Sequence, residues 1–191
     1  MVARRKAQAE NYQPESTKLS TTLTRTVYEE LRQILEESTG IELGENKYSL
    51  VESRLLKRLN TLQLSSFSKY LKLIMESDEE FKIFINCMTT NKTDWFREPR
   101  HFSYLAESAI PILINEKKKG SDQTIYIWSA ASSTGEEIYS LAMTFEEHLS
   151  QSADYRILGT DIDTDVLQKA ASAAYKKTIV EEQVPVHLRM K

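Results

Sequence analysis

The chain has 191 residues, of which 40% are hydrophobic and 28% are charged, and its formal net charge at pH 7 is −3. These values are typical of a globular protein and argue against binding of nucleic acid through bulk positive charge. The chain contains no apolar run of the about 18 residues that a membrane-spanning helix needs, so membrane insertion is not expected. The single cysteine indicates a reducing, cytoplasmic location, and the spacing of the three histidines does not fit a metal site.

Two N-terminal regions differ in their hydrophobic pattern. Residues 1–20 are polar and without periodicity, and they are predicted to form a disordered tail. Residues 21–90 are predicted to form a helical domain, because apolar residues repeat there at spacings of three and four. Gly40 is expected to end the first helix, and Ser77 is expected to begin the fourth. The region is therefore interpreted as a small helical bundle.

Residues 91–120 are interpreted as a linker followed by a helix that covers a ligand site. The linker is polar but is interrupted by aromatic residues. Pro99 is expected to begin the helix, since proline fits the first helical turn. Pro111 is expected to kink the helix before it ends near Gly120.

Residues 121–191 change from a helical pattern to an alternation of strands and helices. The predicted elements are a strand over 124–128, a helix over 136–149, a strand over 155–160 and a helix over 164–174. This order is typical of a parallel sheet with crossover helices. The fold class predicted for the whole chain is therefore α plus α/β, with a helical bundle followed by a partial Rossmann-like domain.

The turn after the first strand, residues 129–135, contains only small residues. In Rossmann-type folds this turn lies against the ligand, where large side chains would block the approach of the backbone. Glu136 and Glu137 follow at once and would repel a phosphate, so they favour a ligand with a cationic end over a dinucleotide. The alternative is a structural capping box, in which Ser133 and Glu136 only cap the next helix.

An acidic segment follows the second strand. Asp161 comes directly off the strand, at the place where a carboxylate binds the ribose diol of a nucleoside. Asp163 and Thr164 are expected to cap the next helix instead. The two turns together predict a nucleoside site at one edge of the sheet.

Three segments in this order resemble the chemotaxis receptor methyltransferases of the CheR family. They are TTNKTDWFRE at 89–98 followed by His101-Phe102, WSAASSTGEEIYSLA at 128–142, and LGTDIDTDVL at 158–167. The resemblance extends over about residues 24–191. It implies that an S-adenosylmethionine-dependent enzyme methylates glutamate side chains on the cytoplasmic helices of chemotaxis receptors, giving methyl esters and S-adenosylhomocysteine.

The resemblance also implies the residues of the site. Those implied to contact the cofactor are Asn91, Thr93, Arg97, Ala131, Glu137 and Asp161. Arg97 is further implied to lie near the reacting centre, and it is the strongest candidate for a catalytic residue. Its alternative role is a helix-terminal ion pair with Glu98.

A basic stripe on the second helix bears on the substrate. Lys47, Arg54 and Arg58 fall on one side of a helix that turns by about 100° per residue. The resemblance implies that this stripe contacts the acidic methylation helices of the receptor. The alternative is an ordinary solvated face.

The chain departs from the family pattern at Trp95, Ser132 and Ile138, and above all in length, because family members continue through five further strands. With the C-terminal part of the sheet absent, at least one sheet face and both edges are expected to be exposed. Three explanations follow: a fragment of the full enzyme, self-association with a second copy, or a natural truncation that binds the cofactor without catalysis.

Overall fold

The computed structural model describes residues 22–117, 124–149 and 154–189, so the tail expected over residues 1–20 lies outside the described residues. The chain divides into two compact units, Met1–Thr89 and Thr90–Lys191, which are described separately below. Within the described ranges, no helix is long and apolar enough to cross a membrane.

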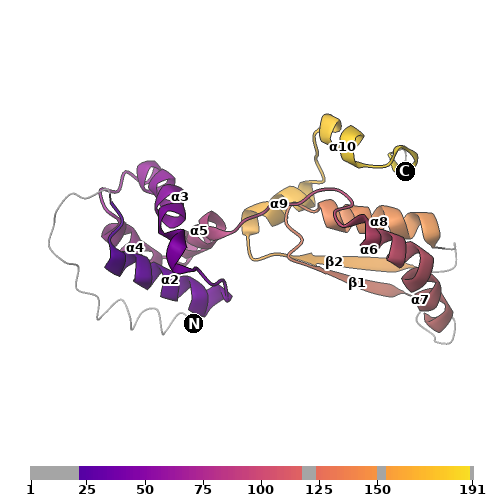
Figure 1. The fold of residues 1–191 in the computed structure, drawn as a ribbon, viewed down its shortest axis with the longest axis horizontal. Coiled ribbons are helices and arrows are strands. Elements are labelled where there is room, and N and C mark those ends of the chain that lie inside the picture. Colours follow the sequence, from indigo (N-terminus) through magenta and orange to yellow (C-terminus); the bar gives the residue numbers. More distant parts are fainter. Residues whose placement is uncertain (1–21, 118–123, 150–153, 190–191) are drawn as a thin grey trace. The chain divides into compact units, whose positions relative to one another are not determined.

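Over residues 22–89, every helix or strand of the first unit that the structure describes is a helix, which confirms the expected bundle (Figure 1). Its elements are α2 (Arg25–Thr39), the 3-10 turn η1 (Glu45–Lys47), α3 (Tyr48–Thr61), α4 (Phe67–Glu76) and α5 (Asp78–Met88). Its core consists of fully buried side chains from all four α-helices, including Leu31, Leu55, Tyr70 and Phe84. The spacing of these residues at three and four positions brings them to one face of each helix.

The helix ends follow the capping residues predicted from the sequence. Gly40 closes α2 in the left-handed region, with φ of 73°, as expected for a C-terminal glycine. Ser77 begins α5, because its side chain accepts a hydrogen bond from the backbone N–H of Glu80. The backbone N–H of Ser77 also donates to the carbonyl of Leu73, so one residue ends α4 and begins α5.

The second unit contains the α/β part of the chain. Its elements are α6 (Pro99–Tyr104), the π-helical turn η2 (Leu105–Ala109), α7 (Ile110–Lys117), β1 (Ile125–Ala130), α8 (Glu136–His148), β2 (Tyr155–Thr160), α9 (Thr164–Ser172), α10 (Lys177–Gln183) and the 3-10 turn η3 (Val186–Leu188). The strands β1 and β2 pair in parallel from Ile125↔Tyr155 to Ala130↔Thr160. The parallel pairing confirms the predicted crossover through α8.

The helix that begins at Pro99 changes its winding before Pro111. The ring of Pro111 has no N–H and would clash with the carbonyl four residues earlier in a regular α-helix. The clash is avoided by the π-helical turn η2, in which the N–H of Ile110 donates a hydrogen bond to the carbonyl of Leu105, five residues earlier. The deviation expected at Pro111 is therefore a widened turn upstream of it.

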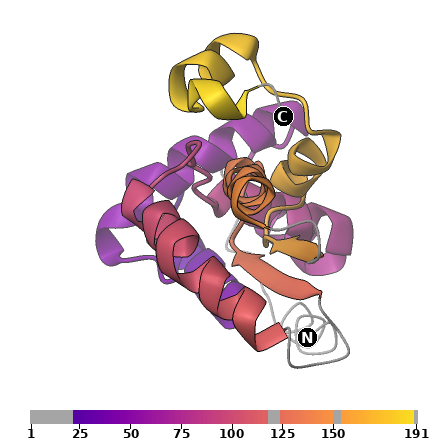
Figure 2. The same cartoon turned by 90° about the vertical axis from the view of Figure 1, so that its right-hand side faces the viewer.

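One face of the sheet is covered and the other is exposed. Ile125 and Ile127 pack against Ile110 of α7 and Phe145 of α8, which places both helices on the same side of the strands (Figure 2). On the opposite face, Tyr126, Trp128 and Leu158 are 65%, 69% and 63% exposed. This confirms the expectation of an uncovered sheet face.

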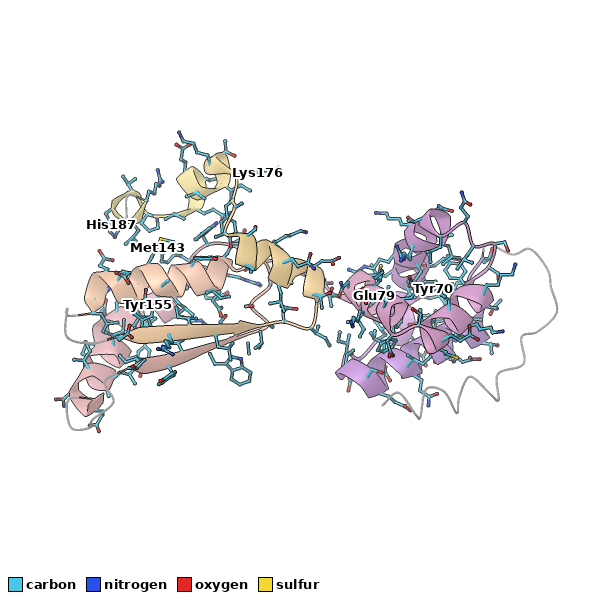
Figure 3. The ribbon with its side chains drawn as sticks, turned by 180° about the vertical axis from the view of Figure 1, so that it is seen from behind. Tyr70, Glu79, Met143, Tyr155, Lys176 and His187 are labelled. Atoms are coloured by element: carbon cyan, nitrogen blue, oxygen red, sulfur yellow. The ribbon has the colours of Figure 1, made fainter. Side chains whose placement is uncertain are left out.

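The C-terminal segment of α10 and η3 was not predicted from the sequence. Val184 and Leu188 are buried against Trp95, and Met143 of α8 packs on the same cluster. In Figure 3, Met143 and His187 mark α8 and η3, the two elements that meet here. The segment therefore ties the region around Trp95 to the outer side of α8.

Candidate functional site

The turn between β1 and α8 has an unusual backbone. Ala131 and Ser133 have positive φ values of 56° and 49°, and Gly135 has a φ of 96°. Left-handed conformations at residues other than glycine cost about 1 kcal/mol or more each, and they persist where the surrounding structure enforces them, often at ligand sites. Ser132 anchors the turn, because its N–H donates to the carbonyl of Thr160 at the end of β2 (2.9 Å).

Gly135 is packed too closely for any larger residue. A Cβ atom at this position would lie 2.7 Å from the Tyr175 hydroxyl and 2.9 Å from the Cβ of Ala170. The Tyr175 hydroxyl donates to the carbonyl of Thr134 (2.6 Å), and its ring packs edge-on against Trp95. Burial raises the pKa of Tyr175, with a further contribution from the charge of Glu136, so the hydroxyl keeps its proton and remains a donor.

The alternative capping box at Ser133 is not formed. Gly135 is the N-cap of α8, and Glu136 accepts its hydrogen bond from the Thr134 hydroxyl (2.6 Å). Ser133 is buried and points elsewhere, since its hydroxyl donates to the carbonyl of Asn91 (3.0 Å). The serine thus links the β1–α8 turn to segment 89–98.

The turn between β2 and α9 completes this junction. One carboxylate oxygen of Asp161 accepts from the backbone N–H of Ser133 (2.8 Å), and the other accepts from the N–H of Asp163 (2.9 Å). Asp163 caps α9, as expected, through the N–H groups of Asp165 and Val166. Its second oxygen accepts from the side-chain amide of Asn91 (2.6 Å). Three segments far apart in the sequence therefore meet at one place.

The remaining predicted cofactor residues lie around this junction. Glu137 is exposed on the first turn of α8, and its carboxylate accepts from the hydroxyl of Ser129 at the end of β1 (2.6 Å). Thr93 is half-buried in segment 89–98. Arg97 is exposed, and its guanidinium donates to the carbonyl of Lys92 (3.1 Å), so in this arrangement it lies against its own segment.

Segment 89–98 is itself held in a strained conformation. Phe96 and Glu98 both have positive φ values, of 51° and 58°. The N–H of Phe96 donates to the hydroxyl of Ser140 in α8 (3.0 Å), and the N–H of Trp95 donates to the side-chain carbonyl of Gln183 (3.1 Å). These contacts fix the segment beside the N-terminal half of α8.

The junction therefore links Asn91 and Asp161 through Ser133 and Asp163. Ala131 lies in the same β1–α8 turn as Ser133, and Glu137 lies in the first turn of α8. Sequence reasoning missed the linking roles of Ser133, Asp163 and Tyr175, each of which depends on a partner more than 25 residues away. Within the described ranges, His, Cys, Asp and Glu side chains form no group of three that could hold a metal ion.

The basic stripe of the first unit has internal partners. Arg58 forms a two-point ion pair with Glu80 of α5 (Nε to Oε1 2.8 Å, Nη2 to Oε2 2.5 Å). Arg54 donates to the carbonyls of Met88 and Thr89 at the end of α5. Lys47 is exposed in η1. Two of the three cations predicted to bind the receptor thus stabilise the packing of α3 on α5.

A parallel strand–helix–strand unit with a strained small-residue turn and an acidic second turn is typical of the nucleoside-binding part of a Rossmann-like domain. The chain belongs to the CheR methyltransferase family: residues 91–191 match its SAM-binding domain, and residues 26–89 match its all-alpha domain.

Curated relatives give the same result. The chain is 40% identical over 167 residues to chemotaxis protein methyltransferase 2 of Pseudomonas aeruginosa, which covers 87% of this chain and 57% of the relative. It is 36% identical over 165 residues to the chemotaxis protein methyltransferase of Escherichia coli, which covers 85% of this chain and 54% of the relative. The chain thus spans little more than half the length of these relatives.

Proposed function

We propose that this chain forms the cofactor-binding part of a cytoplasmic enzyme that methylates glutamate side chains of chemotaxis receptors, with S-adenosylmethionine as the donor. The observation that carries the proposal is the junction of Asn91, Ser133, Asp161 and Asp163. It joins all three segments in which the chain resembles the family. The names of the relatives, which are chemotaxis protein methyltransferases, support the same function.

The chemistry of the residues fits this cofactor. Glu136 and Glu137 stand at the start of α8, where they would repel a phosphate and favour the ammonium end of an amino acid. Each oxygen of Asp161 accepts one backbone hydrogen bond. A carboxylate has about four acceptor positions, so Asp161 keeps the capacity to bind two ribose hydroxyls. Ala131 would line the ligand with its backbone.

The reaction does not require the protein to transfer a proton. A glutamate carboxylate with an ordinary pKa of about 4.3 is already ionised at neutral pH, so a general base is not needed. The bound cofactor supplies an electrophilic methyl group on a good sulfonium leaving group. The residues of this chain then act by orienting the two reactants and by excluding water. We propose that Arg97 turns from the Lys92 carbonyl to hold the acceptor carboxylate, while Asn91 and Thr93 contact the cofactor.

Binding and methyl transfer test the proposal separately. Calorimetry of the 191-residue chain is expected to show binding of S-adenosylhomocysteine, and a lack of binding would overturn the proposal. With a tritiated methyl donor and a receptor cytoplasmic fragment, Arg97→Ala is expected to lower transfer by about 100-fold while the protein stays folded. Arg100→Ala, which removes an exposed arginine of α6, is the matched control. Binding of the product without any transfer by the wild-type chain would instead favour the non-catalytic alternative.

For the receptor, we propose that Lys47 makes the electrostatic contact, since Arg54 and Arg58 are engaged within the unit. Lys47→Glu is expected to lower the rate of receptor methylation severalfold at low ionic strength, and added salt should shrink the difference. Lys57→Glu, at an exposed lysine of α3, the helix that follows η1, is the control. Equal effects of both changes would show that only net charge matters. Reversal at Arg58 would not test binding, because it would bury two carboxylates together.

A further inference from the structure

Asp163 makes more contacts than a helix cap requires. Its side chain is almost fully buried, at 2% exposure. One oxygen, Oδ1, accepts from the N–H groups of Asp165 (2.9 Å) and Val166 (3.3 Å), which completes the cap of α9. Serine, threonine or asparagine would supply that single acceptor equally well. The cap therefore does not explain a buried carboxylate with a second oxygen.

The second oxygen, Oδ2, accepts a hydrogen bond from Nδ2 of Asn91, 72 residues earlier in the chain (2.6 Å). An ionised carboxylate has acceptors only, so it can pair only with the NH₂ side of an amide. The oxygen of the Asn91 amide must then point away from Asp163. The backbone of Asn91 is fixed as well, because its carbonyl accepts from the Ser133 hydroxyl (3.0 Å).

The backbone of Asp163 acts on the neighbouring site residue. Its N–H donates to Oδ1 of Asp161 (2.9 Å), while Oδ2 of Asp161 accepts from the N–H of Ser133 (2.8 Å). The carboxylate of Asp161 is thus held from both sides. Asp163 therefore contacts both Asn91, through its carboxylate, and Asp161, through its backbone N–H, and it is the residue that binds the side-chain amide of Asn91.

We propose that Asp163 is a positioning residue that sets the orientation of the Asn91 amide. With Nδ2 committed to Asp163, Asn91 presents its oxygen to the ligand and selects a hydrogen-bond donor there, such as a hydroxyl or an amine of the cofactor. This inference rests on the proposed function, because it takes the junction to be the cofactor site. It assigns to Asp163 a role in the affinity for that cofactor beyond the capping of α9.

Asparagine at position 163 separates the two roles. Asp163→Asn keeps an oxygen for the cap, but its NH₂ group then faces the NH₂ group of Asn91. The pair can be restored only if the Asn91 amide turns over, which presents a donor to the ligand in place of an acceptor. We expect Asp163→Asn to weaken S-adenosylhomocysteine binding by about tenfold in calorimetry. Asp163→Ser keeps the cap, releases Asn91 and should weaken binding less.

A double-mutant cycle supplies a readout that a structural role would not give. In the Asn91→Ala background, Asp163→Asn is expected to change the affinity by less than about twofold, because the amide that it misorients is gone. Asp165→Asn, at an exposed acid in the same turn of α9, should leave the affinity unchanged.

The outcomes distinguish the inference from the proposed function on which it rests. If Asp163→Asn weakens binding equally in both backgrounds, or has no effect in a wild-type chain that binds, the inference is wrong and the proposed function stands. If the wild-type chain does not bind the ligand, both are overturned. If Asp163→Asn does not fold, the same cycle with Asp163→Ser decides the question.

Discussion

Replacement of Glu80 by alanine is expected to lower the free energy of unfolding of the helical unit by about 2–3 kcal/mol. The carboxylate accepts two hydrogen bonds from Arg58, at 2.8 and 2.5 Å, and the side chains of Arg58 and Glu80 are 22% and 7% exposed. The hydrogen bond with Glu80 raises the pKa of the Arg58 guanidinium. Alanine would leave this cation largely buried without its partner. Because Arg58 keeps some contact with water, the expected loss in free energy of unfolding lies at or below the lower end of the range for breaking a buried ion pair.

Such a loss is large for a unit of this size, since small domains are stable by only about 5 kcal/mol or a little more. Urea unfolding followed by circular dichroism should show a lower midpoint, and faster hydrogen exchange in α3 and α5 should locate the change. Glu79→Ala is the matched control, because Glu79 is the adjacent residue, is 77% exposed and pairs with exposed Lys82. Its effect should stay under about 0.5 kcal/mol. Equal losses for the two variants would mean that the ion pair with Arg58 adds no stability.

The ion pair of Arg58 and Glu80 shows what the apolar periodicity of a helix predicts and what it cannot predict. The apolar repeat of α3 predicts which side of the helix is buried, and Val51, Leu55 and Leu59 are buried as expected. Arg58 lies at the border of that side, where a cation can face either water or a buried acid. Whether Arg58 faces water or a buried acid depends on Glu80 in another helix, and the sequence around Arg58 does not predict that contact. The receptor contact implied for Lys47, Arg54 and Arg58 therefore stays a prediction, and the structure adds that Arg58 has an internal partner in Glu80.

The helix and strand boundaries were predicted best where a local signal decides them. Gly40 and Ser77 act through their own backbone and side chain, so their positions are visible in the sequence. The second strand was predicted over 155–160 and is observed there, because its neighbours break the pattern on both sides. The helix α10 has few apolar residues, and its segment is held through contacts of Val184 with Trp95, far away in the chain. Such an element cannot be predicted from its own residues.

The candidate site likewise contains some residues whose roles could be predicted from local sequence and others whose roles depend on distant partners. Asp161 was identified from its place after a strand, which is a topological rule that the sequence shows directly. Ser133 was open to a local role as a capping residue, and the structure gives it two distant partners, Asn91 and Asp161. The tertiary contacts satisfy both its hydroxyl and its N–H, so they displace the local cap. Asp163 was correctly predicted as a cap, but its second oxygen has a partner 72 residues away.

Gly135→Ala is expected to weaken the binding of S-adenosylhomocysteine by at least about tenfold, the second large effect that the structure predicts. Gly135 has a φ of 96°, which an alanine adopts only at a cost of about 1–3 kcal/mol. The new Cβ would also lie 2.9 Å from the Cβ and 3.2 Å from the Cα of Ala170, so the strain cannot be relieved by a side-chain rotation there. The β1–α8 turn must move away from α9.

That movement would disturb the ligand turn through Tyr175. The new Cβ would lie 2.7 Å from the Tyr175 hydroxyl, which must then give up its 2.6 Å hydrogen bond to the carbonyl of Thr134. Tyr175→Phe removes only that hydrogen bond and should weaken binding less than Gly135→Ala does. Gly44→Ala is the control, because Gly44 has a φ of −66° and no atom lies within 4 Å of the added Cβ. Calorimetry that gave Gly135→Ala an affinity within twofold of wild type would show that this turn does not shape the ligand site.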